Sequence, residues 1–164
     1  MNEDTKYNYL AENIALMSKE FTDYLVNTAE GLKNLGKDID SIWEKSYPII
    51  SSFFLYKSLE YLHTRFLNED AQYTKLEKFV KTIFKEQTKI DPGTVLSEYE
   101  SLSSNNSYMR EMYIGDKIVK SCGGTFSNRV LIDEVCVKFY FYFNNIAVPK
   151  LTRLWMLYGR AGNN

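Results

Sequence analysis

The segment from residue 47 to residue 67 limits the folds open to this chain more than any other stretch. Its first ten residues are apolar on almost every side when placed on a helix, which is typical of a helix buried against neighbours all round. Leucine and phenylalanine then recur along one helical face, at Leu55, Leu59, Leu62 and Phe66. We therefore expect a central helix that begins at Pro48, with Ser46 as its cap.

A membrane span is the alternative interpretation of the same segment. Its uncharged run ends at Lys57, well short of the roughly 20 apolar residues that a bilayer requires. The first residues, MNEDTKYNYL, are acidic and lack the basic start and apolar core of a signal peptide. Cys122 and Cys136 lie apart without a CxxC pattern, so we expect reduced thiols. These features predict a cytoplasmic, intracellular protein without a membrane segment.

The length of 164 residues favours a single domain. Hydrophobic residues make up 45% and charged residues 25% of the chain, as in ordinary globular proteins. Aromatic residues reach 15%, so the core should be rich in rings. We expect one helical domain over residues 1–164, with a helical core in 1–102 and an aromatic-rich C-terminal part in 108–164.

A long first helix is predicted from Thr5 to Leu35, with Gly36 ending it. Apolar side chains recur there at alternating steps of three and four, the spacing of a helix-packing seam: Tyr7, Leu10, Ile14, Met17 and Phe21. This helix would be about 45 Å long, against about 28 Å for the next amphipathic helix, Ala71 to Lys89. We therefore expect the first part of the seam to stay uncovered and to bind a partner through Tyr7, Leu10, Ile14 and Met17.

Shorter elements fill the middle of the chain. Ser41 to Lys45 can form a short helical turn, which Pro48 either separates from the central helix or joins to it at a kink. Asp91-Pro92-Gly93 predicts a helix start, and that helix should run to about Leu102. The sequence SSNNS, residues 103–107, is then a polar loop.

The secondary structure of residues 108–145 is open to two interpretations. Residues 108–121 fit a helix, but also a hairpin that turns at Gly115-Asp116. Residues 135–144 alternate between apolar and more polar side chains, as strands do. Because several predicted helices precede them and no partner strand is evident, we favour helix. The expected fold is a mainly α helical bundle with a long N-terminal helix; a small β element within 108–145 is the alternative.

Residue counting restricts the chemistry available to this chain. Glu60 and His63 form an ExxH on a helix, which is half of a di-metal bundle site, but His63 is the only histidine. The cysteines and His63 are too few for a four-ligand zinc site, and no glycine-rich phosphate loop is present. We expect no catalytic residues, no metal and no cofactor.

The C-terminal segment combines basic and aromatic side chains. Lys150, Arg153 and Arg160 accompany Trp155, and such a mixture can stack on and neutralise nucleic acid. The net charge of the chain is only −1, which makes a nucleic-acid partner the weaker hypothesis.

The sequence thus favours a non-enzymatic protein–protein interaction or assembly module that acts through a helical surface. Its partner would be another protein or further copies of itself, as in a subunit of a larger viral, phage or organellar complex. A helical bundle that binds a small apolar ligand is the first alternative. Weak nucleic-acid binding through the C-terminal segment is the second.

Overall fold

The computed structural model describes residues 2–67, 69–102 and 107–159, and every regular element in these ranges is a helix. The elements are α1 (Glu3–Thr28), α2 (Glu30–Lys33), α3 (Ile39–Phe66), α4 (Asp70–Thr88), α5 (Gly93–Ser101), α6 (Ser107–Ser121), α7 (Arg129–Tyr142), the π-helical turn η1 (Phe143–Ala147) and α8 (Val148–Gly159). The mainly α prediction is confirmed. No strand occurs in the described ranges, so the β alternative within 108–145 is not supported.

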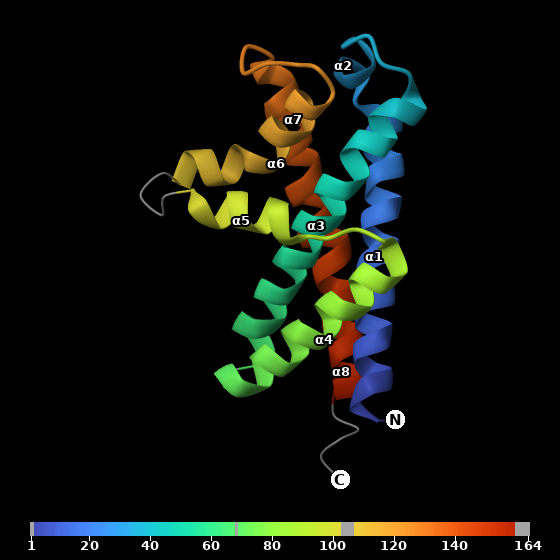
Figure 1. Ribbon diagram of the computed structural model, residues 1–164, viewed down its shortest axis with the longest axis vertical. Coiled ribbons are helices and arrows are strands. Elements are labelled where there is room, and N and C mark those ends of the chain that lie inside the picture. The colour runs from blue at the N-terminus through green and yellow to red at the C-terminus, as the bar shows by residue number, and fades with distance from the viewer. Residues whose placement is uncertain (1, 68, 103–106, 160–164) are drawn as a thin grey trace.

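Three long rods form the frame of the molecule (Figure 1). α1 runs from one end to the other, and α3 returns beside it. α7, η1 and α8 continue one another as a third rod, which also runs back toward the start of α1. α4 crosses obliquely near the lower end, while α5 and α6 project to one side. None of the helices in the described ranges is both long and apolar enough to cross a membrane.

The central helix begins earlier than the sequence suggested. α3 starts at Ile39, where Asp38 accepts a hydrogen bond from the Ser41 N–H at 2.7 Å, and it continues through Pro48. Of the two effects expected of Pro48, the separation into two helices is therefore wrong. A helix can retain a proline at the cost of one backbone hydrogen bond. Packing before and after Pro48 stabilises the helix there, since Ile42 and Ile50 are fully buried.

The start of α1 is core, which corrects the expectation that Tyr7, Leu10, Ile14 and Met17 stay uncovered. All four side chains are at most 5% exposed. The error came from the length assigned to the neighbours: with 28 residues, α3 is as long as α1, which has 26. α4 and α8 also pack against α1, and the Tyr7 ring meets Phe79 of α4 at 5.4 Å.

The segment predicted as one first helix forms two helices. α1 stops at Thr28, and the single turn α2 follows after Ala29. Gly36 has a φ of +85°, the left-handed conformation expected of a residue that terminates a helix. Gly31 lies against α7, since a Cβ there would come within 2.8 Å of a Leu131 methyl group.

Phe139 of α7 joins the three rods through aromatic contacts. Its ring centroid lies 5.6 Å from Phe21 of α1 and 5.1 and 5.9 Å from Phe53 and Phe54 of α3. These separations lie in the range of favourable aromatic pairs. The ring-rich core predicted from composition is thus centred on α7.

A wide helical turn connects α7 to α8. η1 ends at Ala147, two residues before Pro149, which is the second residue of α8. A proline ring in a regular α-helix collides with the carbonyl four residues earlier, and a π-helical turn is one way for a helix to absorb such a conflict. The rod therefore continues through Pro149.

Candidate functional site

An apolar row on the outside of α7 is the most unusual surface feature of the described residues. Val130, Val137 and Phe141 follow one another at steps of seven and four, which places them on one helical face. Their exposed fractions are 84%, 68% and 67%. We refer to these three residues as the α7 face.

The opposite side of the same helix forms core. Val135, Phe139 and Phe143 recur at steps of four and are at most 4% exposed. The alternation that resembled a strand therefore comes from a helix with two apolar sides. A helix that is apolar all round is normally covered all round, yet only one side of α7 is covered here.

An open groove of about 930 Å³ borders the α7 face, and we call it the α7 groove. Its walls come from α3, α5, α6, α7 and η1: Lys57, Tyr99, Arg110, Glu111, Met112, Asp133, Cys136, Val137, Tyr140, Phe141, Asn144 and Asn145. Val137 and Phe141 belong to both features, so the face and the groove form one continuous surface.

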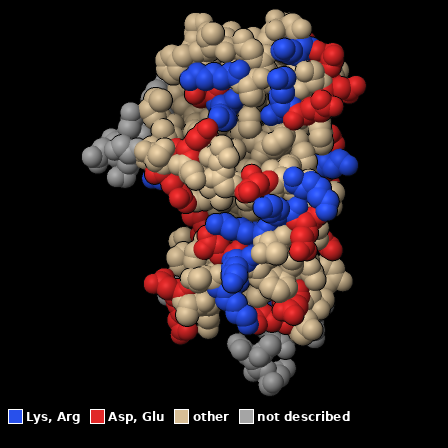
Figure 2. Space-filling model, in the orientation of Figure 1, with Lys and Arg blue, Asp and Glu red and all other residues tan. Residues whose placement is uncertain are grey.

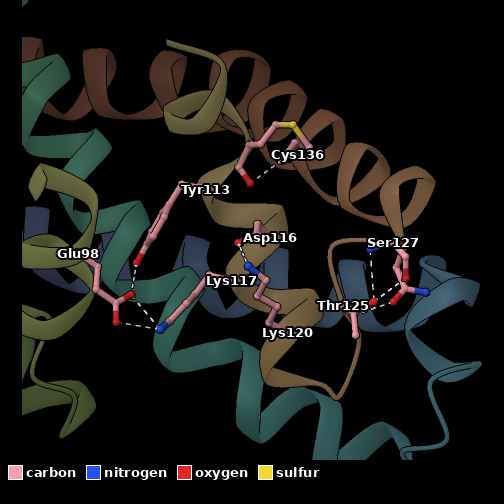
Figure 3. Close-up of polar contacts among 10 residues, drawn as sticks. Glu98, Tyr113, Asp116, Lys117, Lys120, Thr125, Ser127 and Cys136 are labelled. Atoms are coloured by element: carbon pink, nitrogen blue, oxygen red, sulfur yellow. Dashed lines mark hydrogen bonds and ion pairs between the residues drawn. The ribbon is translucent and has the colours of Figure 1, made fainter. Parts of the chain in front are cut away.

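Gly115 sets the close approach of α6 to α7. A Cβ at this position would lie 2.3 Å from the Ile132 carbonyl oxygen and 2.6 Å from Cys136 Sγ. The Cys136 thiol donates to the Met112 carbonyl oxygen at 3.6 Å, a contact drawn in Figure 3. One wall of the α7 groove thus depends on a residue without a side chain.

A polar cluster fixes α5 against α6. The Tyr113 hydroxyl donates to Glu98 at 2.9 Å, and Lys117 Nζ lies 2.8 Å from the same carboxylate (Figure 3). The hydrogen bond from Lys117 lowers the pKa of Glu98 below its usual value. Burial, followed by the bond to Glu98, raises the pKa of Tyr113. The cluster anchors the helix from which Tyr99 enters the groove.

Arg110 is the least satisfied polar group of the groove. Its guanidinium carbon lies 4.9 Å from the centre of the Tyr99 ring, a cation–π contact. Its Nε atom is shielded from solvent and has no hydrogen-bond partner, and no carboxylate in the described ranges forms an ion pair with Arg110.

Two of the other charged groups in the groove already have partners. Lys57 Nζ lies 3.0 Å from Glu60, and Asp133 lies 3.7 Å from Arg129 Nε. Glu111 has no ion pair within the described part of the chain. The groove therefore presents one unpaired cation and one unpaired carboxylate beside apolar walls.

The Cys136 thiol and the Tyr140 phenol of the groove are held in their neutral forms. Burial raises the pKa of the Cys136 thiol to about 11, and burial likewise raises the pKa of Tyr140. A thiol reacts as its thiolate, so Cys136 is poorly suited to act as a nucleophile at neutral pH. Neutral thiol and phenol groups suit non-covalent contact better than covalent catalysis.

The ExxH pair lines a second, smaller hollow between α3 and α4. Glu60 and His63 border it together with Glu77, and its volume is about 300 Å³. The imidazole stacks on Tyr73 at 3.9 Å. Across the described ranges, no three His, Cys, Asp or Glu side chains come together as a metal site would need. The expected absence of metal stays a prediction.

The basic and aromatic residues of the C-terminal segment are only partly available. The Trp155 ring stacks with Phe66 at 5.7 Å, and Lys6 Nζ lies 3.5 Å from its centre. Arg153 is exposed and Lys150 half-buried, while Arg160 lies outside the described residues. Figure 2 shows basic and acidic side chains interspersed over the face it draws. These observations do not favour a nucleic-acid surface.

Sequence reasoning placed the contact surface on α1, but the structure leaves the apolar row on α7. The sequence signal for the α7 surface was the alternation of residues 135–144. The apolar residues of that alternation are more than one buried helical face can hold. No protein-family model matches this chain, and neither a curated protein nor a solved structure is significantly similar to it.

Proposed function

We propose that this protein is a non-enzymatic interaction module that binds a partner protein through the α7 face and the α7 groove. The observation that carries the proposal is the exposure of Val137 and Phe141 on a helix whose other side is core. Exposed apolar side chains beside a groove are typical of contact sites between proteins.

The geometry suits a helical or extended segment of the partner. From Val130 to Phe141 the α7 face spans eleven residue-to-residue steps, or about 17 Å of helix. Amphipathic helices bind such surfaces by placing apolar anchors in a groove at helical spacing. The α7 groove provides room for such anchors.

A small apolar ligand is a weaker candidate for the same place. Ligand pockets usually enclose most of the bound molecule, whereas the α7 groove is open to solvent. Val130 also extends the apolar row beyond the lining of the groove. A long surface with an open trough favours a macromolecular partner.

Site-specific photo-crosslinking tests the proposal. A photoreactive phenylalanine analogue at position 141, introduced in the cell that naturally makes the protein, should capture a defined partner. The same analogue at Leu16, an exposed residue of α1, is the control. The captured partner is then purified and titrated against the wild-type chain and against Phe141→Glu.

The expected result is direct binding that Phe141→Glu weakens by about tenfold or more, equivalent to about 1.4 kcal/mol, while the melting temperature stays near that of the wild type. Equal crosslinking at positions 16 and 141, or a partner that binds Phe141→Glu normally, would contradict the proposal.

A further inference from the structure

Arg110 gives the α7 groove a preference for charge as well as for apolar surface. Resting on the proposed function, we infer that the segment bound there is amphipathic and places an aspartate or glutamate against Arg110. Its apolar residues cover Val137 and Phe141, and its carboxylate forms an ion pair with the guanidinium.

The guanidinium of Arg110 lines the open groove and has no ion pair in the described ranges. Its Nε atom is shielded, so the carboxylate of a bound segment would pair with the terminal guanidinium nitrogens. A charge that is covered by a partner without a counter-charge is unfavourable. The Tyr99 ring supports the guanidinium from one side, but an aromatic face does not replace a hydrogen-bond acceptor. A carboxylate fits because its two oxygens match the fork of donors on a guanidinium.

The surroundings exclude the groove's own acids from that role. Asp133 is paired with Arg129 at 3.7 Å. Glu60, which is paired with Lys57 at 3.0 Å, does not line the groove. Glu111 follows Arg110 directly on α6, and consecutive helical residues point in different directions. The free acceptor must therefore come from outside the described chain.

Glu111 also sets where the acid of the partner can lie. Its carboxylate has no ion pair in the described ranges, so an acidic residue placed beside it would be repelled. The bound segment should thus carry its acid on the Arg110 side and neutral or basic residues on the Glu111 side. This asymmetry would fix the register of the segment in the groove.

The length of the surface favours a peptide segment over a free carboxylic acid. From Val130 to Phe141 the α7 face extends over about 17 Å, with the partly exposed Glu134 between Val130 and Val137, and Val130 lies outside the groove in which Arg110 sits. A single small acid could pair with Arg110 but could not also cover Val130. A segment with helical apolar spacing covers both.

Peptide display against the full-length chain tests the inference. The probe is a library of random peptides about 16 residues long, enough for four helical turns, displayed on phage. Selected peptides are synthesised and titrated against the wild type, Arg110→Gln, Arg110→Lys and Glu111→Gln. Lys120→Gln, which removes a cation of α6 outside the groove lining, is the matched control.

We expect selected peptides to combine Asp or Glu with apolar residues at helical spacing. Arg110→Gln should weaken them about tenfold or more, because a hydrogen bond to a charged group is lost. Arg110→Lys should retain part of the affinity, since it keeps the charge but not the planar fork. Glu111→Gln should bind at least as tightly as the wild type, and Lys120→Gln should bind equally. A melting temperature for each variant separates loss of binding from loss of fold.

Three kinds of outcome would overturn the inference. If the peptides need Phe141 but bind Arg110→Gln as well as the wild type, the docking surface stands and the acidic partner is wrong. Self-association of the chain that Phe141→Glu abolishes, or saturable binding of dodecanoate that competes with the peptides and needs Arg110, would replace the partner segment with a second copy or a fatty acid. If no selected peptide depends on Val137 or Phe141, the proposed function fails as well.

Discussion

Gly115 and Gly31 both lie in helices beside α7, but an added methyl group would meet different neighbours. At Gly115 it would meet the Ile132 carbonyl oxygen at 2.3 Å, a backbone atom that cannot move alone. At Gly31 it would meet a Leu131 methyl group at 2.8 Å, the end of a flexible side chain. The same substitution should therefore have different consequences at the two positions.

Gly115→Ala should lower the free energy of unfolding by about 1–3 kcal/mol, the usual cost of overpacking. It should also widen the distance between α6 and α7. Gly31→Ala should change stability by less than about 1 kcal/mol, because helix propensity favours alanine. Urea denaturation of both variants checks this. Equal losses would mean that α6 and α7 do not approach as closely as described.

The stability of the α5–α6 contact should depend on pH through Glu98. The pKa of Glu98 is lowered in the folded chain, chiefly by the Lys117 hydrogen bond. The resulting stabilisation is fully present above the unfolded pKa, near 4.5, and is lost as the pH falls through the folded value. The side chain is 41% exposed, so the contribution should be modest.

Glu98→Gln should accordingly cost about 0.2–1 kcal/mol at neutral pH, as partly exposed ion pairs do. The difference from the wild type should shrink below about pH 4. Urea titrations at several pH values measure it, and Lys117→Gln should remove the same acid-sensitive part. A difference that persists unchanged in acid would show that the charge of Glu98 is not what stabilises the contact.

At the scale of elements, α1 shows how a correct pattern led to a wrong surface. The step of three and four through Leu10, Ile14 and Met17 correctly identified one helical face. Whether that face meets the rest of the chain or a partner depended on the length of α3, which the sequence understated because Pro48 suggested a break. The pattern along a helix shows which side is apolar, but it does not show what covers that side.

Leu10→Glu should therefore unfold or severely destabilise the chain, because it buries a carboxylate in the core. Leu16→Glu is the matched control: this leucine lies on the same helix and is 47% exposed, so the variant should stay within about 0.5 kcal/mol of the wild type. Thermal melts of the two proteins decide between core and surface. A well-folded Leu10→Glu protein would restore the partner-binding interpretation of α1.

α7 shows the opposite case, in which the pattern was ambiguous and the surroundings decided. Its alternating residues fit a strand, yet Phe139 must meet Phe21, Phe53 and Phe54 at once, and a helix between α1 and α3 achieves this. The helices at residues 71–89 and 93–102 could be predicted, since strong periodicity and clear start signals agree there. The groove could not, because it joins residues from α3, α5, α6 and α7 that only the packed fold brings together.

Phe139→Ala and Phe141→Ala compare the two sides of α7 directly. Phe139 is fully buried and Phe141 is 67% exposed. The first substitution should cost about 3–5 kcal/mol, as truncation of a buried phenylalanine does. The second should fall within about 0.5 kcal/mol of the wild type. Comparable losses would mean that Phe141 belongs to the core.

At the scale of the whole molecule, three rods enclose one aromatic core and leave one apolar face open. α1 is covered by α3, α4 and α8, and the inner side of α7 completes the core. Its outer side, next to the α7 groove, retains exposed valine and phenylalanine at helical spacing. Because Val137 and Phe141 stay largely exposed in the monomer, the proposed function attributes them to binding.

The most direct test of this account is a paired measurement on the Val137→Glu/Phe141→Glu double variant. Its urea unfolding is compared with that of the wild type, and its affinity for the photo-crosslinked partner is measured by calorimetric titration. We predict a change in unfolding free energy below about 1 kcal/mol, together with a loss of affinity of about a hundredfold or more, equivalent to about 2.7 kcal/mol. A double variant that unfolds, or one that binds the partner as tightly as the wild type, would contradict the account.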